Sequence, residues 1–380
     1  MPIDSVRAKA ELLSSGISLT PAVLDNYGLP YLEKRRAYGN QDPPGLRHKK
    51  IPQELRLEPH DLVVAASVNP DSENVLDYDG VSYFIRNAGG EKIDVNFSLR
   101  PEFYDYVMST RQKVSQVITL YGGHSLGVFV YGDCVHVRDG KACHFCSVSQ
   151  NRDKGTDFVK VVREDHIAEA VELALGDKKT DIRQVMVNGG NFPDLDKSFL
   201  HYLQVAKAAR GAIDRVGRKI DMHLIISPPH DLELLRKLSG IDVSVAMNTE
   251  AFDPESFEKF CPGKAGMIGR DNIFRGLETA VEVLGEGRVY SIFVGGLEPL
   301  ESMEKGMRFV SEMGVTPVIN VLHVDPETPL ALSNYPSPAP EYIMEAGKIL
   351  QGIYRTYGFK PFYDHCGRNS LDTEAYNQLF

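Results

Sequence analysis

Three cysteines stand close together in the chain, and their spacing is C-x8-C-x2-C. They are Cys134, Cys143 and Cys146, and the same stretch contains His136 and His144. Thiolates bind zinc and hold iron–sulfur clusters. A closed structural zinc site takes four ligands, so that interpretation needs one of the histidines. Three thiolates with no obvious fourth suit a [4Fe–4S] cluster with one open iron, and unligated thiols are the third interpretation.

The elements that position these cysteines are predicted from the chain around them. An apolar, strand-like run ends just before Cys134, and strand-like runs then alternate with helix-like ones, which predicts βαβ units and a parallel sheet. The six strands are expected at residues 127–131, 184–187, 221–226, 243–247, 289–294 and 318–322. The helices are expected at 166–175, 197–216, 231–238, 270–284 and 300–313. This α/β pattern fits a partial (β/α)6 TIM-like barrel, in which functional residues collect where the strands end.

Suggestive residues do follow the second and third predicted strands. Asn188 is followed by Gly189 and Gly190, and paired glycines let the backbone approach a ligand closely. A simple turn is the alternative for this pair. Ser227 follows the third strand, in front of two prolines, and the plainer interpretation there is the start of a helix.

The fourth strand is followed by an amide and a carboxylate, at Asn248 and Glu250. Side chains alternate along an extended segment, so residues two apart point the same way. Such a pair can accept hydrogen bonds from a vicinal diol. The next helix carries Arg275, with Arg270 as an alternative; a guanidinium matches a carboxylate, although either arginine could be a surface charge.

These features, in this order, resemble the radical SAM superfamily, whose common cluster spacing is C-x3-C-x2-C. The C-x-aromatic-C half is kept here, with Phe145 as the aromatic residue, while the first gap is wider. The resemblance covers about residues 120–335 and includes a last-strand segment, 317–330, like that of the biotin and lipoyl synthase branch.

The resemblance implies roles for individual residues. Cys134, Cys143 and Cys146 would hold the [4Fe–4S] cluster, and S-adenosyl-L-methionine would occupy its fourth iron. The implied contacts to this cofactor are Phe145 beside the cluster, Asn188, Gly189 and Gly190 near the methionine amino group, Ser227 near SAM, Asn248 and Glu250 at the ribose hydroxyls, Arg275 at the carboxylate, and Phe293 and Gly295 at the adenine. Asn191 stands where the family has an acid.

The implied activity is reductive cleavage of SAM to a 5′-deoxyadenosyl radical that abstracts hydrogen from a small-molecule substrate. Rearrangement, cleavage or methylation would follow, and no side chain need act as acid or base in the abstraction. A flavodoxin or ferredoxin type of donor is implied. Sulfur insertion is the alternative within the class, although Cys261 and Cys366 are too few for a conventional second cluster. A zinc-stabilised barrel without redox chemistry, and a barrel that has lost catalysis, are the rivals.

Composition limits the remaining choices. The chain has 380 residues and a net charge of −10, which argues against non-specific nucleic-acid binding. We expect no secretory signal, no membrane span and, with five cysteines, a reducing cytoplasm.

Three regions are predicted. Residues 1–117 form an N-terminal α+β extension, with strands at 62–66, 81–86 and 93–97 and a helix at 101–116. Residues 118–335 form the barrel, and 336–380 a C-terminal helix and tail that close it. The polar tail segment 363–370 either binds substrate near the barrel mouth or is a solvated end.

Overall fold

The computed structural model of the chain describes residues 4–25, 32, 51–148 and 158–380. Its larger sheet has the strand order β13-β12-β11-β10-β9-β8-β7. The six strands from β13 to β8 are parallel, and β7 joins the edge antiparallel to β8. The strands are β7 (Ile118–Tyr121), β8 (Ser125–Phe129), β9 (Gln184–Asn188), β10 (Asp221–Ile225), β11 (Ser244–Ala246), β12 (Val289–Gly295) and β13 (Thr316–Val321).

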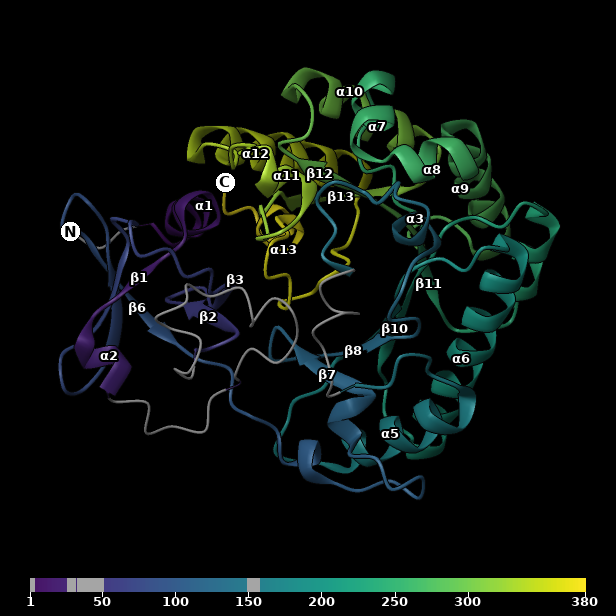
Figure 1. Cartoon of the computed structure of the whole chain (residues 1–380), viewed down its shortest axis with the longest axis horizontal. Coiled ribbons are helices and arrows are strands. Elements are labelled where there is room, and N and C mark those ends of the chain that lie inside the picture. The colour runs from purple at the N-terminus through teal and green to yellow at the C-terminus, as the bar shows by residue number, and fades with distance from the viewer. Residues whose placement is uncertain (1–3, 26–31, 33–50, 149–157) are drawn as a thin grey trace.

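Helices lie along the outer side of this curled sheet, as Figure 1 shows for α5, α6 and α9. The first are α3 (Val135–Arg138), α5 (Glu164–Gly176), α6 (Leu195–Val216) and the 3-10 helix η4 (Leu232–Leu238). They are followed by α7 (Pro254–Phe260), α8 (Pro262–Met267), α9 (Arg270–Leu284), α10 (Leu300–Glu312), α11 (Pro329–Leu332), α12 (Pro340–Tyr357) and α13 (Asp372–Tyr376). The long α6 begins at Asp194, whose carboxylate accepts from the Lys197 N–H, and ends at Gly217 with φ +72°.

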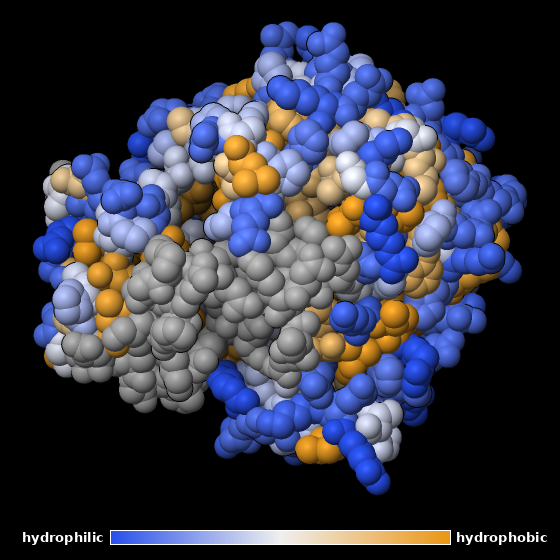
Figure 2. Space-filling model, in the orientation of Figure 1, coloured by the Kyte–Doolittle hydropathy of each residue, from blue (hydrophilic) through white to orange (hydrophobic). Residues whose placement is uncertain are grey.

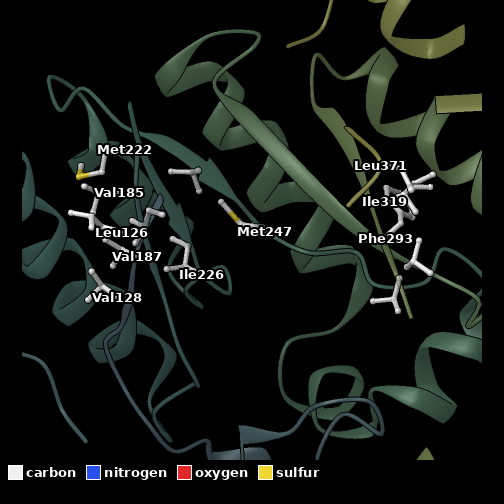
Figure 3. Packing of buried hydrophobic residues seen from close by; sticks show 14 of the residues in the cluster. Leu126, Val128, Val185, Val187, Met222, Ile226, Met247, Phe293, Ile319 and Leu371 are labelled. Atoms are coloured by element: carbon white, nitrogen blue, oxygen red, sulfur yellow. The ribbon is translucent and has the colours of Figure 1, made fainter. Parts of the chain in front are cut away.

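Side chains alternate between the two faces of the sheet. Leu126, Val185 and Met222 belong to the large hydrophobic core between the strands and the helices (Figure 3). Tyr290 and Ile292 point the other way and belong to a second cluster inside the sheet, together with residues of the C-terminal tail. The inner face is therefore filled by apolar side chains below the ends of the strands.

The C-terminal tail joins the two edges of the curled sheet. On one side, the Val321 N–H of β13 donates to the Asn369 carbonyl at 2.8 Å, and the Leu371 N–H donates to the Ile319 carbonyl of β13 at 3.1 Å. On the other side, the Arg368 guanidinium lies 4.0 Å from the centre of the Tyr121 ring on β7. A Cβ at Gly122, in the turn between β7 and β8, would lie 2.2 Å from the Cys366 carbonyl oxygen. Only glycine therefore fits at this position. The tail is therefore not a solvated end, because much of it, including Phe362 and Cys366, is buried inside the sheet.

The N-terminal region contains a second sheet with the strand order β1-β4-β5-β6-β2-β3. Its strands are β1 (Ser18–Leu19), β2 (Glu54–Leu57), β3 (Leu62–Ala65), β4 (Val75–Tyr78), β5 (Tyr83–Arg86) and β6 (Lys92–Asn96), preceded by α1 (Ser5–Ser15) and joined by α2 (Pro21–Asp25). This sheet meets the larger one through the buried carboxylate of Glu54, which accepts the Gly122 N–H at 2.9 Å. It also meets the tail, where the Ala65 N–H donates to the Arg368 carbonyl.

The predicted strands and most predicted helices of the larger sheet are present, and the mixed α/β class is confirmed. The predicted helix at 101–116 is wrong. The structure has two short 3-10 helices instead, η2 (Glu102–Asp105) and η3 (Val114–Gln116), with Arg111 at φ +66° between them. A tight turn closed by the Arg111 N–H to the Met108 carbonyl interrupts any helix there. The predicted helix at 231–238 is a 3-10 helix.

The face of the molecule in Figure 2 is mostly hydrophilic, with small hydrophobic areas scattered among charged residues. Within the described residues, the search for a helix long and apolar enough to cross a membrane found none.

Candidate functional site

A cavity of about 340 Å³ lies where the parallel strands end. It is lined by residues in or directly after the strands from β8 to β13, by the cysteine loop and by the C-terminal tail. The cysteine loop and first strand ends contribute Phe129, Cys134, His136, Cys143, Phe145, Cys146, Val148, Asn188, Gly189, Gly190 and Asn191. The remaining lining residues are Ile225, Ile226, Ser227, Asn248, Glu250, Lys264, Ile292, Val294, Asn320, Val321, Leu322, His323, Tyr363 and Asn369.

The cysteine loop is held against the end of β9 by the two glycines there. The Gly190 N–H donates to the Tyr131 carbonyl at 3.0 Å, and the Val135 N–H donates to the Asn191 carbonyl at 2.9 Å. A Cβ at Gly190 would lie 1.7 Å from the Asp133 carbonyl oxygen, which is an impossible contact. The glycine pair therefore lets the backbone of the cysteine loop pack closely against the end of β9, and it also lines the cavity.

The three thiols face the same cavity but lie in different electrostatic surroundings. Burial raises the pKa of Cys134, and it raises the pKa of Cys146 to about 12, with the neighbouring Cys143 adding to that rise. The pKa of Cys143 is lowered, first by a hydrogen bond from Cys261 and then by the Lys264 ammonium, although burial opposes both. Cys143 is therefore the loop thiol most readily converted to the thiolate that binds metal.

Cys261, at the junction of α7 and α8, is fully buried. It is not isolated, because burial and then the neighbouring Cys143 raise its pKa well above the ordinary value. The junction of α7 and α8 that carries it is fastened to the cysteine loop. The His144 N–H donates to the Phe260 carbonyl at 2.8 Å, and the Gly263 N–H donates to the Lys141 carbonyl at 3.0 Å.

A buried ion pair lies in the cavity wall between Glu250 and Lys264. Burial lowers the pKa of Lys264, but Glu250 and the thiols of Cys143 and Cys261 outweigh it, so the pKa is raised and the side chain is an ammonium. Glu250 has φ +63°, and its backbone pairs with β12 on both sides, through Ile292 and Val294. Its carboxylate is thus fixed at the cavity by both backbone and side chain.

Asn191 connects two neighbouring side chains in the cavity. Its amide donates to the Ser227 hydroxyl at 3.0 Å and lies 3.3 Å from His136 Nε2. Burial, followed by the Lys264 charge, lowers the pKa of His136 to about 4, so the imidazole is neutral and Nε2 can accept. This ring nitrogen is already engaged, and the His144 ring packs against Phe260 outside the cavity lining. Neither histidine is placed as a free fourth zinc ligand.

The opposite end of the cavity is polar and comes from segments far apart in sequence. The Asn320 amide donates to the Tyr363 hydroxyl at 3.4 Å, and Asn369 lies on the tail beside them. Among the described residues, buried Oδ1 atoms of Asn248 and Asn369 accept no hydrogen bond. These two acceptors are therefore available to a bound molecule.

Three residues predicted to contact a cofactor lie elsewhere. Arg275 is exposed on α9, and the alternative Arg270 is tied to the Phe252 carbonyl. Phe293 is fully buried on the outer face of β12, near Ile319 and Leu371 (Figure 3).

Gly295 shares the outer face of β12 with Phe293, and a Cβ there would lie 3.1 Å from the Ile319 side chain. The residues of β12 that line the cavity are Ile292 and Val294. Strand alternation could have found them once the inward face was known. Lys264 had no such sequence signal. His136 was marked only as a possible zinc ligand, and Asn369 only as part of the polar segment 363–370.

The donor set fits an iron–sulfur cluster. Three thiols from one loop line one cavity, and a cubane cluster takes each cysteine at a different iron. Among residues 4–25, 32, 51–148 and 158–380, no three His, Cys, Asp or Glu side chains are arranged to hold a single metal ion. Cys134, Cys143 and Cys146 would hold the cluster at this wall.

Three solved structures are similar to this chain, all at low sequence identity. A radical SAM methyltransferase from Sphaerobacter thermophilus shares 13% identity and a TM-score of 0.47, covering 79% of this chain and 82% of that one. The FeFe-hydrogenase maturase HydG from Carboxydothermus hydrogenoformans is 15% identical, with a TM-score of 0.44. The match covers 63% of this chain and 53% of that one. Methylornithine synthase is 15% identical, with a TM-score of 0.43, and the match covers 60% of this chain and 63% of that one. This chain therefore spans about half of that maturase.

None of the curated proteins matches this chain. The family model described as the radical SAM superfamily matches residues 140–310. That segment contains Cys143 and Cys146 and the ends of the four strands from β9 to β12. Residues 140–310 are therefore similar to the radical SAM superfamily domain.

Proposed function

We propose that this protein is a radical SAM enzyme whose [4Fe–4S] cluster is held by Cys134, Cys143 and Cys146. The observation that carries the proposal is the placement of all three thiols on the cavity that also receives Asn188, Gly190, Ser227, Asn248 and Glu250. When bound, the cluster and SAM would supply a 5′-deoxyadenosyl radical that abstracts hydrogen from the substrate. The chain's own residues position both cofactors and exclude water from that radical.

The cavity residues support specific contacts to SAM. The carboxylate of Glu250, which is paired with Lys264, and the amide of Asn248 are acceptors suited to ribose hydroxyls. Gly189 and Gly190 leave their backbone accessible at the cavity. Ile292 and Val294 offer an apolar wall for the adenine, in place of Phe293 and Gly295. We assign no carboxylate contact to Arg275, because its side chain is on the surface.

The reaction we favour is hydrogen abstraction from a small molecule, followed by rearrangement, cleavage or methylation. Sulfur insertion of the lipoyl or biotin synthase type would use a second cysteine set. Cys261 lies at the junction of α7 and α8, whereas Cys366 lies inside the sheet beside Gln184, so the two remaining cysteines belong to different parts of the fold. A one-electron donor of the flavodoxin or ferredoxin type in the cytoplasm would serve such an enzyme.

The proposal is tested by purifying the protein without oxygen and reconstituting it with iron and sulfide. We expect about four irons and four sulfides per chain, the content of a [4Fe–4S] cluster. Dithionite and SAM should then yield 5′-deoxyadenosine, detected by liquid chromatography. A colourless protein that binds zinc and leaves SAM intact would refute the proposal and favour the structural zinc interpretation.

The substitution Asn248→Ala should weaken SAM binding with little effect on folding. The Oδ1 atom is buried and accepts no hydrogen bond from the described residues, so its removal leaves no protein donor unpaired. Loss of one ligand hydrogen bond of about 1.4 kcal/mol would raise the dissociation constant for SAM roughly tenfold. Equilibrium dialysis with the reconstituted protein measures that constant. The control is Asn272→Ala, which removes a hydrogen bond to the Pro229 carbonyl outside the cavity lining. Equal effects of the two substitutions would contradict the assignment.

A further inference from the structure

The end of the cavity formed by β13 and the C-terminal tail carries polar side chains that the proposed cluster and SAM contacts leave unused. Those contacts come from the cysteine loop and from the ends of β9 to β12. Asn320 on β13 and Tyr363 and Asn369 on the tail line the cavity beyond them. The tail segment 363–370 is also the one whose polar composition suggested substrate binding. This part of the lining is therefore left to a second molecule.

Hydrogen bonding at this end of the cavity is incomplete. The buried Oδ1 atom of Asn369 accepts no hydrogen bond from the described residues. The Tyr363 hydroxyl accepts from the Asn320 amide at 3.4 Å and, within the same residues, donates to no acceptor. Burial raises the pKa of this tyrosine well above its ordinary value, so the hydroxyl keeps its proton. The site therefore offers a bound molecule one acceptor and one donor.

The backbone of the tail holds these two side chains in place. The Asn369 carbonyl accepts the Val321 N–H of β13 at 2.8 Å. The Tyr363 N–H donates to the buried carboxylate of Asp372 at 2.9 Å. A ligand therefore meets groups that are already ordered, which lowers the entropic cost of binding.

The charged side chains in the described lining already have partners. Lys264 is paired with Glu250, and His323 Nδ1 lies 3.0 Å from Asp325 Oδ1. An ionised group on the ligand would enter this partly buried site without a counter-charge from the described residues, which is costly. The polar end of the cavity therefore favours a neutral ligand group.

We propose, resting on the function proposed above, that Asn320, Tyr363 and Asn369 form the substrate-binding end of the cavity, and that the substrate presents to them a neutral group with both a donor and an acceptor, such as a primary carboxamide. Asn369 Oδ1 accepts from the donor of this group, and the Tyr363 hydroxyl donates to its acceptor. A carboxylate supplies no donor and an ammonium supplies no acceptor, so neither satisfies both atoms.

The test uses benzamide as the probe, with benzoate and benzylamine as charged counterparts of similar shape. Saturation-transfer difference NMR on the full-length, reconstituted protein with SAM, kept without oxygen, measures the dissociation constant of each probe. Equilibrium dialysis of SAM with and without benzamide shows whether the probe displaces the cofactor. The variants are Asn369→Ala and Tyr363→Phe, and circular dichroism melting checks that both are folded. The control is Asn377→Ala, on the same tail but exposed and outside the cavity lining.

We expect benzamide to bind more tightly than either charged probe and to leave SAM bound. Each cavity variant should weaken benzamide binding about tenfold, the value of one hydrogen bond of about 1.4 kcal/mol, and the control should not change it. The proposal would be overturned by a charged probe that binds as tightly as benzamide, by no binding of benzamide, by displacement of SAM, or by unchanged binding in a folded cavity variant. Iron and sulfide are measured on the same samples, and a wild type without iron would instead refute the proposed function.

Discussion

Replacing Cys143 with alanine is expected to reduce bound iron to the background level and to abolish formation of 5′-deoxyadenosine. Cys143 has the lowered pKa among the loop thiols, so it is the one most readily deprotonated to a metal-binding thiolate. A cluster held by three protein thiolates loses a third of its protein ligands in this variant. We expect at least a hundredfold loss of product, which is about 2.7 kcal/mol at the level of a rate. Iron analysis and product chromatography measure the two losses separately.

The same result is expected for Cys134→Ala and Cys146→Ala, because all three thiols line the one cavity. Cys366→Ala is the matched control, since it removes a buried thiol that contacts Gln184 inside the sheet. Its expected iron content is that of the wild type. Circular dichroism melting of the unloaded proteins checks that the cysteine variants remain folded. Normal iron in Cys143→Ala, or equal iron loss in Cys366→Ala, would contradict the cluster assignment.

The sheet was predictable from the sequence because its strands are short apolar runs separated by amphipathic helices. Strands such as β9 and β12 are buried on both faces, as expected of a sheet with helices outside and packed side chains inside. The helix predicted at 101–116 failed because tertiary contacts decide that segment. Phe103 and Tyr104 are buried there, and the Tyr104 hydroxyl accepts the Leu120 N–H at 2.8 Å.

The cavity was predictable only in part. Residues that directly follow a strand, such as Asn188, Ser227 and Asn248, could be placed by the rule that strand ends meet at one edge. Within β12 the predicted set was displaced by one residue, and a shift of one exchanges the two faces of a strand. Lys264 and Asn369 reach the cavity from a helix junction and from the C-terminal tail. Such contacts depend on how distant segments pack, and no local pattern encodes them.

Replacing Lys9 with methionine is expected to destabilise the whole protein by about 3–5 kcal/mol, the usual result of breaking one partner of a buried ion pair. Lys9 on α1 lies 2.6 Å from Glu374 on α13, and both side chains are 2% exposed. The ammonium also donates to the Gly367 carbonyl at 3.0 Å. Burial raises the pKa of Glu374 and Lys9 opposes that rise, so methionine would leave an acid without its compensating charge. Urea unfolding followed by circular dichroism measures the loss.

The matched control for this prediction is on the same helix. Arg7 forms exposed ion pairs with Glu11 and Glu341, and Arg7→Met should cost about 1 kcal/mol or less. The double variant Lys9→Met with Glu374→Gln should recover part of the loss, because neither charge is then left alone in the interior. Equal small effects of Lys9→Met and Arg7→Met would contradict the prediction.

This ion pair is connected to the cavity by the C-terminal tail. Lys9 binds both Gly367 and Glu374, which lie on either side of Asn369, and the Asn369 carbonyl accepts the Val321 N–H at 2.8 Å. Tyr363 on the same tail lines the cavity beside Asn320. The N-terminal extension therefore holds in place a segment that forms one wall of the site. A single unfolding transition for wild type and Lys9→Met would show that extension, sheet and tail fold as one unit, whereas separate early loss of the extension would show that the site stands without it.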